Sequence, residues 1–193
     1  MIKEIINIMK VLTAPEKYIK EPDDICVFLA GGITNCKEWQ DEVIKKLKTS
    51  SNTGNLVIFN PRRENFPIGN PNETNRQIAW EFEMIEKADI FSMYFCNDNS
   101  DQPICMYELG RNIVRIQQKY PGSWEQRIIV TVEHGYKREK DVEIQLALAT
   151  NGKVSVRHDV NSHSAAISSI FTIIKCENKN ASNVVKLKDT YII

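Results

Sequence analysis

The chain has 193 residues, of which 42% are hydrophobic and 26% charged. This length fits a single domain with a normal buried core, and the composition excludes a disordered or fibrous protein. Twenty-five basic residues balance twenty-five acidic ones, so the formal net charge is zero. A neutral chain lacks long-range attraction for nucleic acids and anionic membranes, so we expect neither as a partner and favour a small molecule.

Cysteines and histidines give no metal-binding or disulfide pattern in the sequence. The cysteines are odd in number and lack C-x-x-C spacing, which predicts neither a disulfide framework nor a zinc site. His134, His158 and His163 also lack metal-ligand spacing, and each is expected in a loop or at the surface. We find no signal peptide and no apolar stretch near the 18 or so residues of a membrane span. The sequence therefore predicts a cytoplasmic protein without metal or cofactor.

From residue 25 onward, short apolar runs alternate with longer segments of helical periodicity, which is typical of βα units in a parallel sheet. The expected strands are residues 25–30, 55–60, 89–95, 127–132 and, more weakly, 153–156. Helices are expected between them, with apolar faces formed by Trp39, Val43, Ile44 and Leu47, by Ile78, Phe82 and Ile85, and by Leu109, Ile113 and Ile116. A helix at 141–150 and another at 164–175 complete the pattern, the last with Ile167, Ile170, Phe171 and Ile174.

Five such units predict a flavodoxin-like open parallel sheet of about five strands, in the order 2-1-3-4-5, with helices on both faces. We place the domain at residues 25–176, between a lead segment, 1–24, and a tail, 177–193, whose last three residues are a candidate partner contact. Ligands of such sheets bind at the carboxyl ends of the strands. The segments expected to meet there are 31–34, 61–66, 96–107 and 133–136.

Several residues in these segments have two interpretations. Gly31 and Gly32 join a strand to a helix, and they either let the backbone approach a phosphate or sugar or simply form a tight turn. Arg62 and Arg63 either clamp a 5′-phosphate or pair with neighbouring acids. Tyr136 either stacks on a base or packs within its loop.

Two carboxylates are the candidates for chemistry. Glu108 is predicted in the first turn of the helix after the third strand, where free amides and the helix dipole keep it ionised. It is then either a nucleophile or a residue that favours the helix start. Glu81 lies in an acidic stretch of the preceding helix, which is either a solvated face or the second half of a catalytic pair. Such a pair suits glycosyl transfer, because one carboxylate attacks the anomeric carbon and the other exchanges a proton with the base.

Five motifs give the sequence a family resemblance. VFLAGGIT (27–34), EWQDEV (38–43), NPRRENF (60–66), QIAWEFEMIEKADIFSMYF (77–95) and PICMYELG (103–110) closely resemble the nucleoside 2-deoxyribosyltransferase-like family. VLTAPE (11–16) and HGYKREKDVEI (134–144) resemble its branch with F-L-A-G and N-P-R-R motifs. The resemblance extends over about residues 11 to 160.

The resemblance implies a flavodoxin-like protein that cleaves the N-glycosidic bond of a deoxyribonucleoside or its 5′-phosphate, without a metal. By the family's motifs, Glu108 attacks C1′ to form a covalent intermediate, and Glu81 handles the proton of the base. The remaining contacts that the resemblance implies are base contacts from Arg63, Asn65 and Phe66 and a sugar or phosphate cradle from Ala30, Gly31 and Gly32. A homo-oligomer is also expected, because relatives complete the pocket from a neighbouring subunit.

The chain departs from the family at two positions. The tyrosine that supports the nucleophile is replaced by Val27, and the aspartate before the nucleophile falls near Asp101. Tyr94 or Tyr107 would compensate. These departures leave hydrolysis open beside base exchange, and two alternatives remain: a nucleotide sensor without turnover, and cleavage of a ribonucleotide such as NAD.

Overall fold

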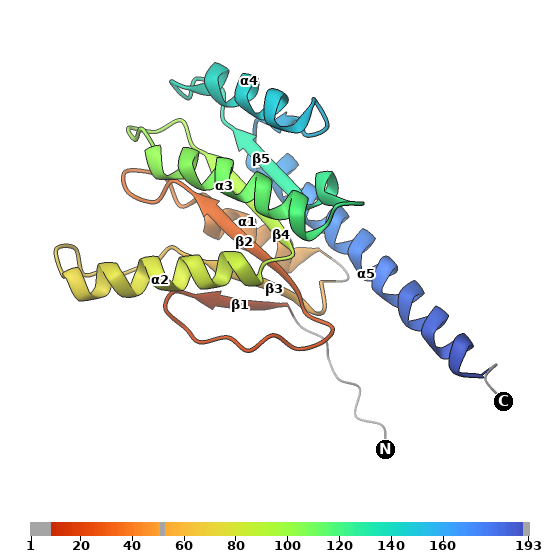
Figure 1. The fold of residues 1–193 in the computed structure, drawn as a ribbon. Helices are drawn as coiled ribbons and strands as arrows, with labels where there is room; N and C mark the ends of the chain where they lie inside the picture. Colours follow the sequence, from red (N-terminus) through yellow and green to blue (C-terminus); the bar gives the residue numbers. More distant parts are fainter. Residues whose placement is uncertain (1–8, 51–52, 191–193) are drawn as a thin grey trace.

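The computed structural model describes residues 9–50 and 53–190, with only the backbone within 181–190. The described residues form one parallel sheet in the order β1-β3-β2-β4-β5-β6 (Figure 1). Its strands are Lys10–Thr13 (β1), Ile25–Gly31 (β2), Leu56–Asn60 (β3), Ile90–Phe95 (β4), Ile128–Val132 (β5) and Val156–Arg157 (β6). All residues of β3, β4 and β5 are buried, as expected for strands covered on both faces.

The flavodoxin-like fold and the predicted strand order are confirmed, since β3-β2-β4-β5-β6 reproduces 2-1-3-4-5. The sheet has one strand more than predicted. β1, from the segment 1–24 that we described as a lead, pairs with β3 from Lys10↔Val57 to Thr13↔Asn60. A four-residue edge strand carries too short an apolar pattern to be recognised by periodicity.

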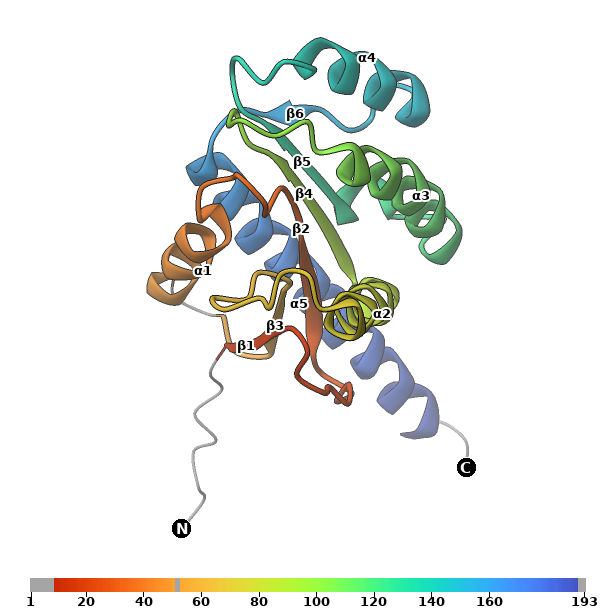
Figure 2. The same cartoon turned by 90° about the vertical axis from the view of Figure 1, so that its left-hand side faces the viewer.

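Helices cover both faces of the sheet. They are Trp39–Thr49 (α1), Pro71–Lys87 (α2), Pro103–Lys119 (α3), Glu139–Thr150 (α4) and Val160–Thr190 (α5), with a short 3-10 helix at Trp124–Arg127. Figure 2 shows α1 and α5 on one face and α2, α3 and α4 on the other. The carboxyl end of the sheet is therefore bordered by the loops that lead into these helices.

The predicted apolar faces of the helices after the first and third predicted strands and of the last helix are buried. The predicted face of α2 is confirmed only at Ile85, which is buried. Ile78 and Phe82 are 59% and 55% exposed. α2 packs on the sheet through Trp80, Met84 and Ile85, because two overlapping apolar faces run along this helix and the one that carries Trp80 and Met84 faces the interior. Phe82 lies under the guanidinium of Arg111, 4.2 Å from its ring centroid.

The last helix is longer than predicted. α5 begins at Val160 and continues to Thr190, and among its described side chains, up to residue 180, the last one buried against the sheet is Ile174. Its C-terminal part extends past the sheet (Figure 1). Residues 191–193, the candidate partner contact, lie outside the described residues. Among the described residues, no helix combines the length and the apolar character that crossing a membrane requires.

Candidate active site

A cavity of about 230 Å³ lies at the carboxyl end of the central strands. The end of β2 and its following loop, Ala30 to Thr34, form one wall, and Pro61 after β3 contributes to another. Ser100 and Gln102 border it from the loop before α3. Three of the four segments predicted to meet therefore do so, whereas residues 133–136 lie outside this cavity.

The glycine pair at the end of β2 lets two chain segments approach closely. A Cβ on Gly31 would lie 2.3 Å from the carbonyl oxygen of Tyr94, and one on Gly32 would lie 2.3 Å from Cys36 Sγ. Gly31 also has φ +151°, a backbone conformation that L side chains rarely adopt. The pair thus ends β2 just before a turn at residues 34–35 and also lines the cavity, and its contact with a phosphate or sugar stays a prediction.

Arg62 fixes the loop between β2 and α1 from inside the protein. Its Nε donates to Gln40 Oε1 at 2.9 Å, and its Nη2 donates to the carbonyl oxygens of Cys36 at 3.2 Å and Lys37 at 2.8 Å. A third carbonyl, that of Gly32, lies 3.4 Å from the same Nη2. The guanidinium of Arg62 therefore binds carbonyl oxygens of the protein. This contact differs from the phosphate clamp that was one interpretation of the sequence.

The other predicted residues of this loop lie away from the cavity. Arg63 Nη1 pairs with Glu73 Oε2 at 2.8 Å, and its guanidinium lies 5.3 Å from the ring centroid of Phe66. Asn65 is exposed. The structure therefore does not bring Arg63, Asn65 and Phe66 to the cavity, and Arg63 follows the ion-pair interpretation with an acid from α2.

Glu81 reaches the cavity from α2 and is held there by the residue one turn earlier. Gln77 Nε2 donates both to Glu81 Oε1, at 2.8 Å, and to the carbonyl oxygen of Pro61, at 2.7 Å. This bridge ties the carboxyl group to the loop after β3. Burial raises the pKa of Glu81 above its ordinary value, and the Gln77 hydrogen bond partly opposes that rise.

Glu108 reaches the same cavity from α3, but not in the way the sequence predicts. The left-handed conformation of Gln102, with φ 47°, starts the helix at Pro103, so Glu108 is in the second turn. The predicted first-turn position was therefore wrong, and the free backbone amides expected to keep Glu108 ionised are not beside it. Burial, together with the charge of Glu81, raises the pKa of Glu108 to about 7, although Arg111 acts in the opposite direction.

The two carboxyl groups form an interacting pair. The charge of Glu81 contributes to the raised pKa of Glu108, so a change in the charge of Glu81 changes how readily Glu108 ionises. Cys105 also lines the cavity, although the sequence offered no motif to single it out. Burial and the charge of Glu108 raise the pKa of the Cys105 thiol to about 12, so it stays neutral and is a poor nucleophile.

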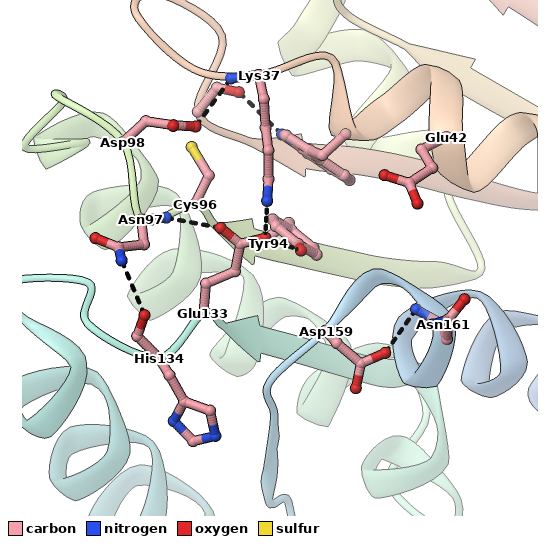
Figure 3. Close-up of polar contacts among 12 residues, drawn as sticks. Lys37, Glu42, Tyr94, Cys96, Asn97, Asp98, Glu133, His134, Asp159 and Asn161 are labelled. Atoms are coloured by element: carbon pink, nitrogen blue, oxygen red, sulfur yellow. Dashed lines mark hydrogen bonds and ion pairs between the residues drawn. The ribbon is translucent and has the colours of Figure 1, made fainter.

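The tyrosines considered as substitutes for the missing family tyrosine do not reach the cavity. Tyr94 points to the α1/α5 face of the sheet, stacks on Trp39 with a centroid distance of 4.6 Å, and donates to Glu133 Oε1 at 2.5 Å. Figure 3 shows Tyr94 and Lys37 meeting at Glu133. Tyr107 is 68% exposed on α3. Neither therefore supports Glu108 in this structure.

Tyr136 and Asp101 also lie outside the cavity. Tyr136 is buried against Phe95, with a centroid distance of 5.4 Å, and its hydroxyl donates to the carbonyl oxygen of Asp101 at 2.9 Å. The carboxylate of Asp101 pairs with Lys137. The packed-loop interpretation of Tyr136 is thus the one that the structure shows.

His163, which we expected in a loop or at the surface, is fully buried at the start of α5. Its ring nitrogens lie 2.7 Å from Ser92 Oγ and 2.8 Å from Thr131 Oγ1. Burial lowers the pKa of His163 to about 3, so the ring is neutral. The earlier start of α5 places this residue on its interior face.

Comparison with known proteins agrees with the position of the cavity. A family model described as nucleoside 2-deoxyribosyltransferase like matches residues 24–121, just over half of the chain. That range contains all the residues that line the cavity, Glu81 and Glu108 among them. No curated protein matches the chain at a significant level.

Proposed function

Because the chain belongs to the nucleoside 2-deoxyribosyltransferase-like family, we propose that it cleaves or transfers the N-glycosidic bond of a nucleoside or a nucleoside 5′-phosphate. The observation that carries this proposal is the convergence of Glu81 and Glu108, from two different helices, on one cavity. Two carboxyl groups in one cavity are the equipment of glycosyl transfer and glycoside hydrolysis, and a separation of about 5 Å would give retention.

In the proposed reaction, the Glu108 carboxylate attacks C1′ of the sugar. The bond from C1′ to the base nitrogen breaks, its electron pair leaves with the base, and Glu81 gives the base a proton. Water or a second base then attacks C1′, the bond to Glu108 breaks, and Glu81 takes the proton of the attacking group. The pKa of Glu108, about 7, leaves part of this group ionised at neutral pH, as attack on C1′ requires, and burial of Glu81 favours its protonated form.

The cavity supports a compact substrate. Its volume of about 230 Å³ is below the range of about 300–1,000 Å³ that is usual for larger ligands. We propose that the backbone of Ala30, Gly31 and Gly32 borders the sugar, since these residues line the cavity and the glycines leave room for close approach.

Chromatography of reaction products tests the proposal. Deoxyribonucleosides, ribonucleosides, their 5′-monophosphates and NAD are each incubated with the protein, with and without an acceptor base. Free base indicates hydrolysis, a new nucleoside indicates transfer, and nicotinamide indicates cleavage of NAD. Ligand binding by calorimetry with no product after hours would replace the proposal with a sensor function.

Substitution then tests the roles of the two glutamates. Glu108→Ala is expected to reduce turnover by at least about 1,000-fold, as removal of a covalent nucleophile does. Glu83→Gln is the matched control, because Glu83 lies on α2 near Glu81 but pairs with Lys87 at the surface. Peptide mapping after acid quenching should find a sugar attached to Glu108. A Glu108→Ala variant within a few-fold of the parent would overturn its assignment as the nucleophile.

A further inference from the structure

A second group of polar side chains gathers where β5 and β6 end, outside the glutamate cavity. His134 follows β5, His158 follows β6, and Glu139 is the first residue of α4. β5 and β6 pair in parallel, with Val130 opposite Val156, so the residues that follow them emerge at the same edge of the sheet. The fold thus joins two histidines whose separation in the sequence gave no metal-binding pattern.

The distances in this group are those of metal ligands. Glu139 Oε1 lies 2.9 Å from His134 Nδ1 and 3.8 Å from His158 Nδ1. One ligand atom from each of the three residues lies within 4.8 Å of the others. Tetrahedral zinc with bonds of about 2.1 Å holds its ligand atoms about 3.4 Å apart, a value between the two measured distances. Because the two imidazole rings are nearly parallel, at least one ring must turn before lone pairs of both histidines meet at one ion.

The surroundings keep the three side chains in place. The two imidazole rings stack with a centroid distance of 4.1 Å and an interplanar angle of 12°. Glu139 Oε2 accepts a hydrogen bond from the Gly135 amide at 3.0 Å, which leaves Oε1 directed at the rings. His158 Nδ1 donates to the carbonyl oxygen of Val132 at 3.1 Å, so coordination of an ion by this nitrogen would replace that hydrogen bond.

We propose that His134, Glu139 and His158 bind a divalent transition metal ion of the zinc type, with the remaining position open to water. Imidazole nitrogen with one carboxylate oxygen favours such ions over calcium or magnesium, which prefer oxygen ligands. Each imidazole coordinates through a nitrogen without a proton, and the single proton of the neutral ring stays on its other nitrogen. The His134 side chain is 75% exposed, so an ion reaches the group from solvent. The bound ion joins the ends of β5 and β6 to α4, apart from the glutamate cavity.

Metal titration of the full-length chain tests this inference without reference to catalysis. Cys36, Cys96 and Asp98 are a second group of potential ligands, so the titrations use a Cys36→Ser background. Zinc chloride should bind with one equivalent and raise the midpoint of thermal unfolding. Cobalt(II) should give d–d absorption without the strong charge-transfer band of thiolate coordination.

Matched variants locate the ion. His134→Ala and Glu139→Gln should each weaken zinc binding by at least about 100-fold, since each removes a direct ligand. His134→Ala is the safer variant for folding, because its ring is largely exposed. Glu143→Gln, also on α4 but paired with Lys140, should bind zinc like the Cys36→Ser parent. Failure of that parent to bind zinc at 1:1, or equal affinity in His134→Ala and Glu139→Gln, would overturn the proposal.

Discussion

Glu81 and Glu108 line one cavity from two different helices, and the charge of Glu81 adds to burial in raising the pKa of Glu108 to about 7. A carboxyl group with this pKa is half ionised at neutral pH. This relationship links the proposed chemistry to pH and to the stability of the fold, and each link can be measured.

Replacing Glu81 with glutamine should lower the pKa of Glu108. The substitution removes the neighbouring negative charge and leaves burial nearly unchanged, so ionisation of Glu108 becomes easier. The titration of Glu108 is followed by NMR with carboxyl-labelled glutamate, in the parent and in Glu81→Gln. In the parent, kcat/KM for base release should rise as pH increases through about 7. An unchanged Glu108 midpoint in Glu81→Gln would show that the two groups do not interact.

Glu108→Gln should stabilise the fold at pH 8. The pKa of Glu108 is higher in the folded chain than its ordinary value of 4.5, so the folded state favours the protonated form. The contribution of Glu108 to the free energy of unfolding therefore falls as pH rises from about 4.5 through about 7. Glutamine stays neutral, and we expect a gain on the order of 1 kcal/mol at pH 8 that shrinks toward pH 5, after allowing for partial exposure. Urea unfolding at both pH values measures it, and an equal gain in Glu83→Gln would contradict the assignment.

The sheet could be predicted from sequence because buried parallel strands are continuous apolar runs, which few other structures produce. The convergence of residues 31–34, 61 and 100–105 followed from the strand order alone. The face of α2 could not be predicted, because Trp80 and Met84 compete with Ile78 and Phe82 for the interior. Packing against the sheet, and not periodicity, decides that competition.

Site details were harder to predict where they depend on backbone conformation or strand register. The environment of Glu108 depends on the left-handed conformation of Gln102. A glutamine does not predict that conformation. Tyr94 is opposite Gly31 in the sheet, and its side chain points to the α1/α5 face, away from the glutamates. The role of Arg62 depends on three carbonyl groups that a loop brings together, which only the folded structure reveals.

Gly31→Ala should destabilise the fold strongly. The added methyl group would lie 2.3 Å from the Tyr94 carbonyl oxygen and 2.6 Å from the Trp39 ring, and neither can move without disturbing the sheet. We expect a loss of roughly 2–4 kcal/mol in the free energy of unfolding, measured with urea. Gly110→Ala is the control: its Cβ meets nothing within 4 Å on α3, so it should stabilise by up to about 1 kcal/mol. Similar effects of the two substitutions would contradict the close packing at Gly31.

Arg62→Lys should cost more stability than Arg63→Lys. The guanidinium of Arg62 donates to Gln40 and to loop carbonyls in several directions, which a single ammonium group cannot reproduce. A loss of about 1–3 kcal/mol follows from buried hydrogen bonds left unmade. Arg63 makes one ion pair with Glu73, which lysine can retain, so its loss should stay below about 1 kcal/mol. Thermal and urea unfolding of both variants compare them, and equal losses would show that Arg62 does not hold the loop.

Cys36 should react with iodoacetamide faster than the buried thiols of Cys26 and Cys105 in the core. A hydrogen bond with Cys96 lowers the pKa of Cys36, whereas burial raises the pKa of Cys26 to about 11 and that of Cys105 to about 12. Because the thiolate is the reactive form, we expect at least about a tenfold faster reaction at Cys36 at pH 8. Peptide mapping by mass spectrometry gives the rate at each site, with the exposed Cys176 as the accessible reference. Cys96→Ala should slow Cys36 by removing the hydrogen bond; an unchanged Cys36 rate in that variant would mean that access, and not the Cys96 contact, sets its reactivity.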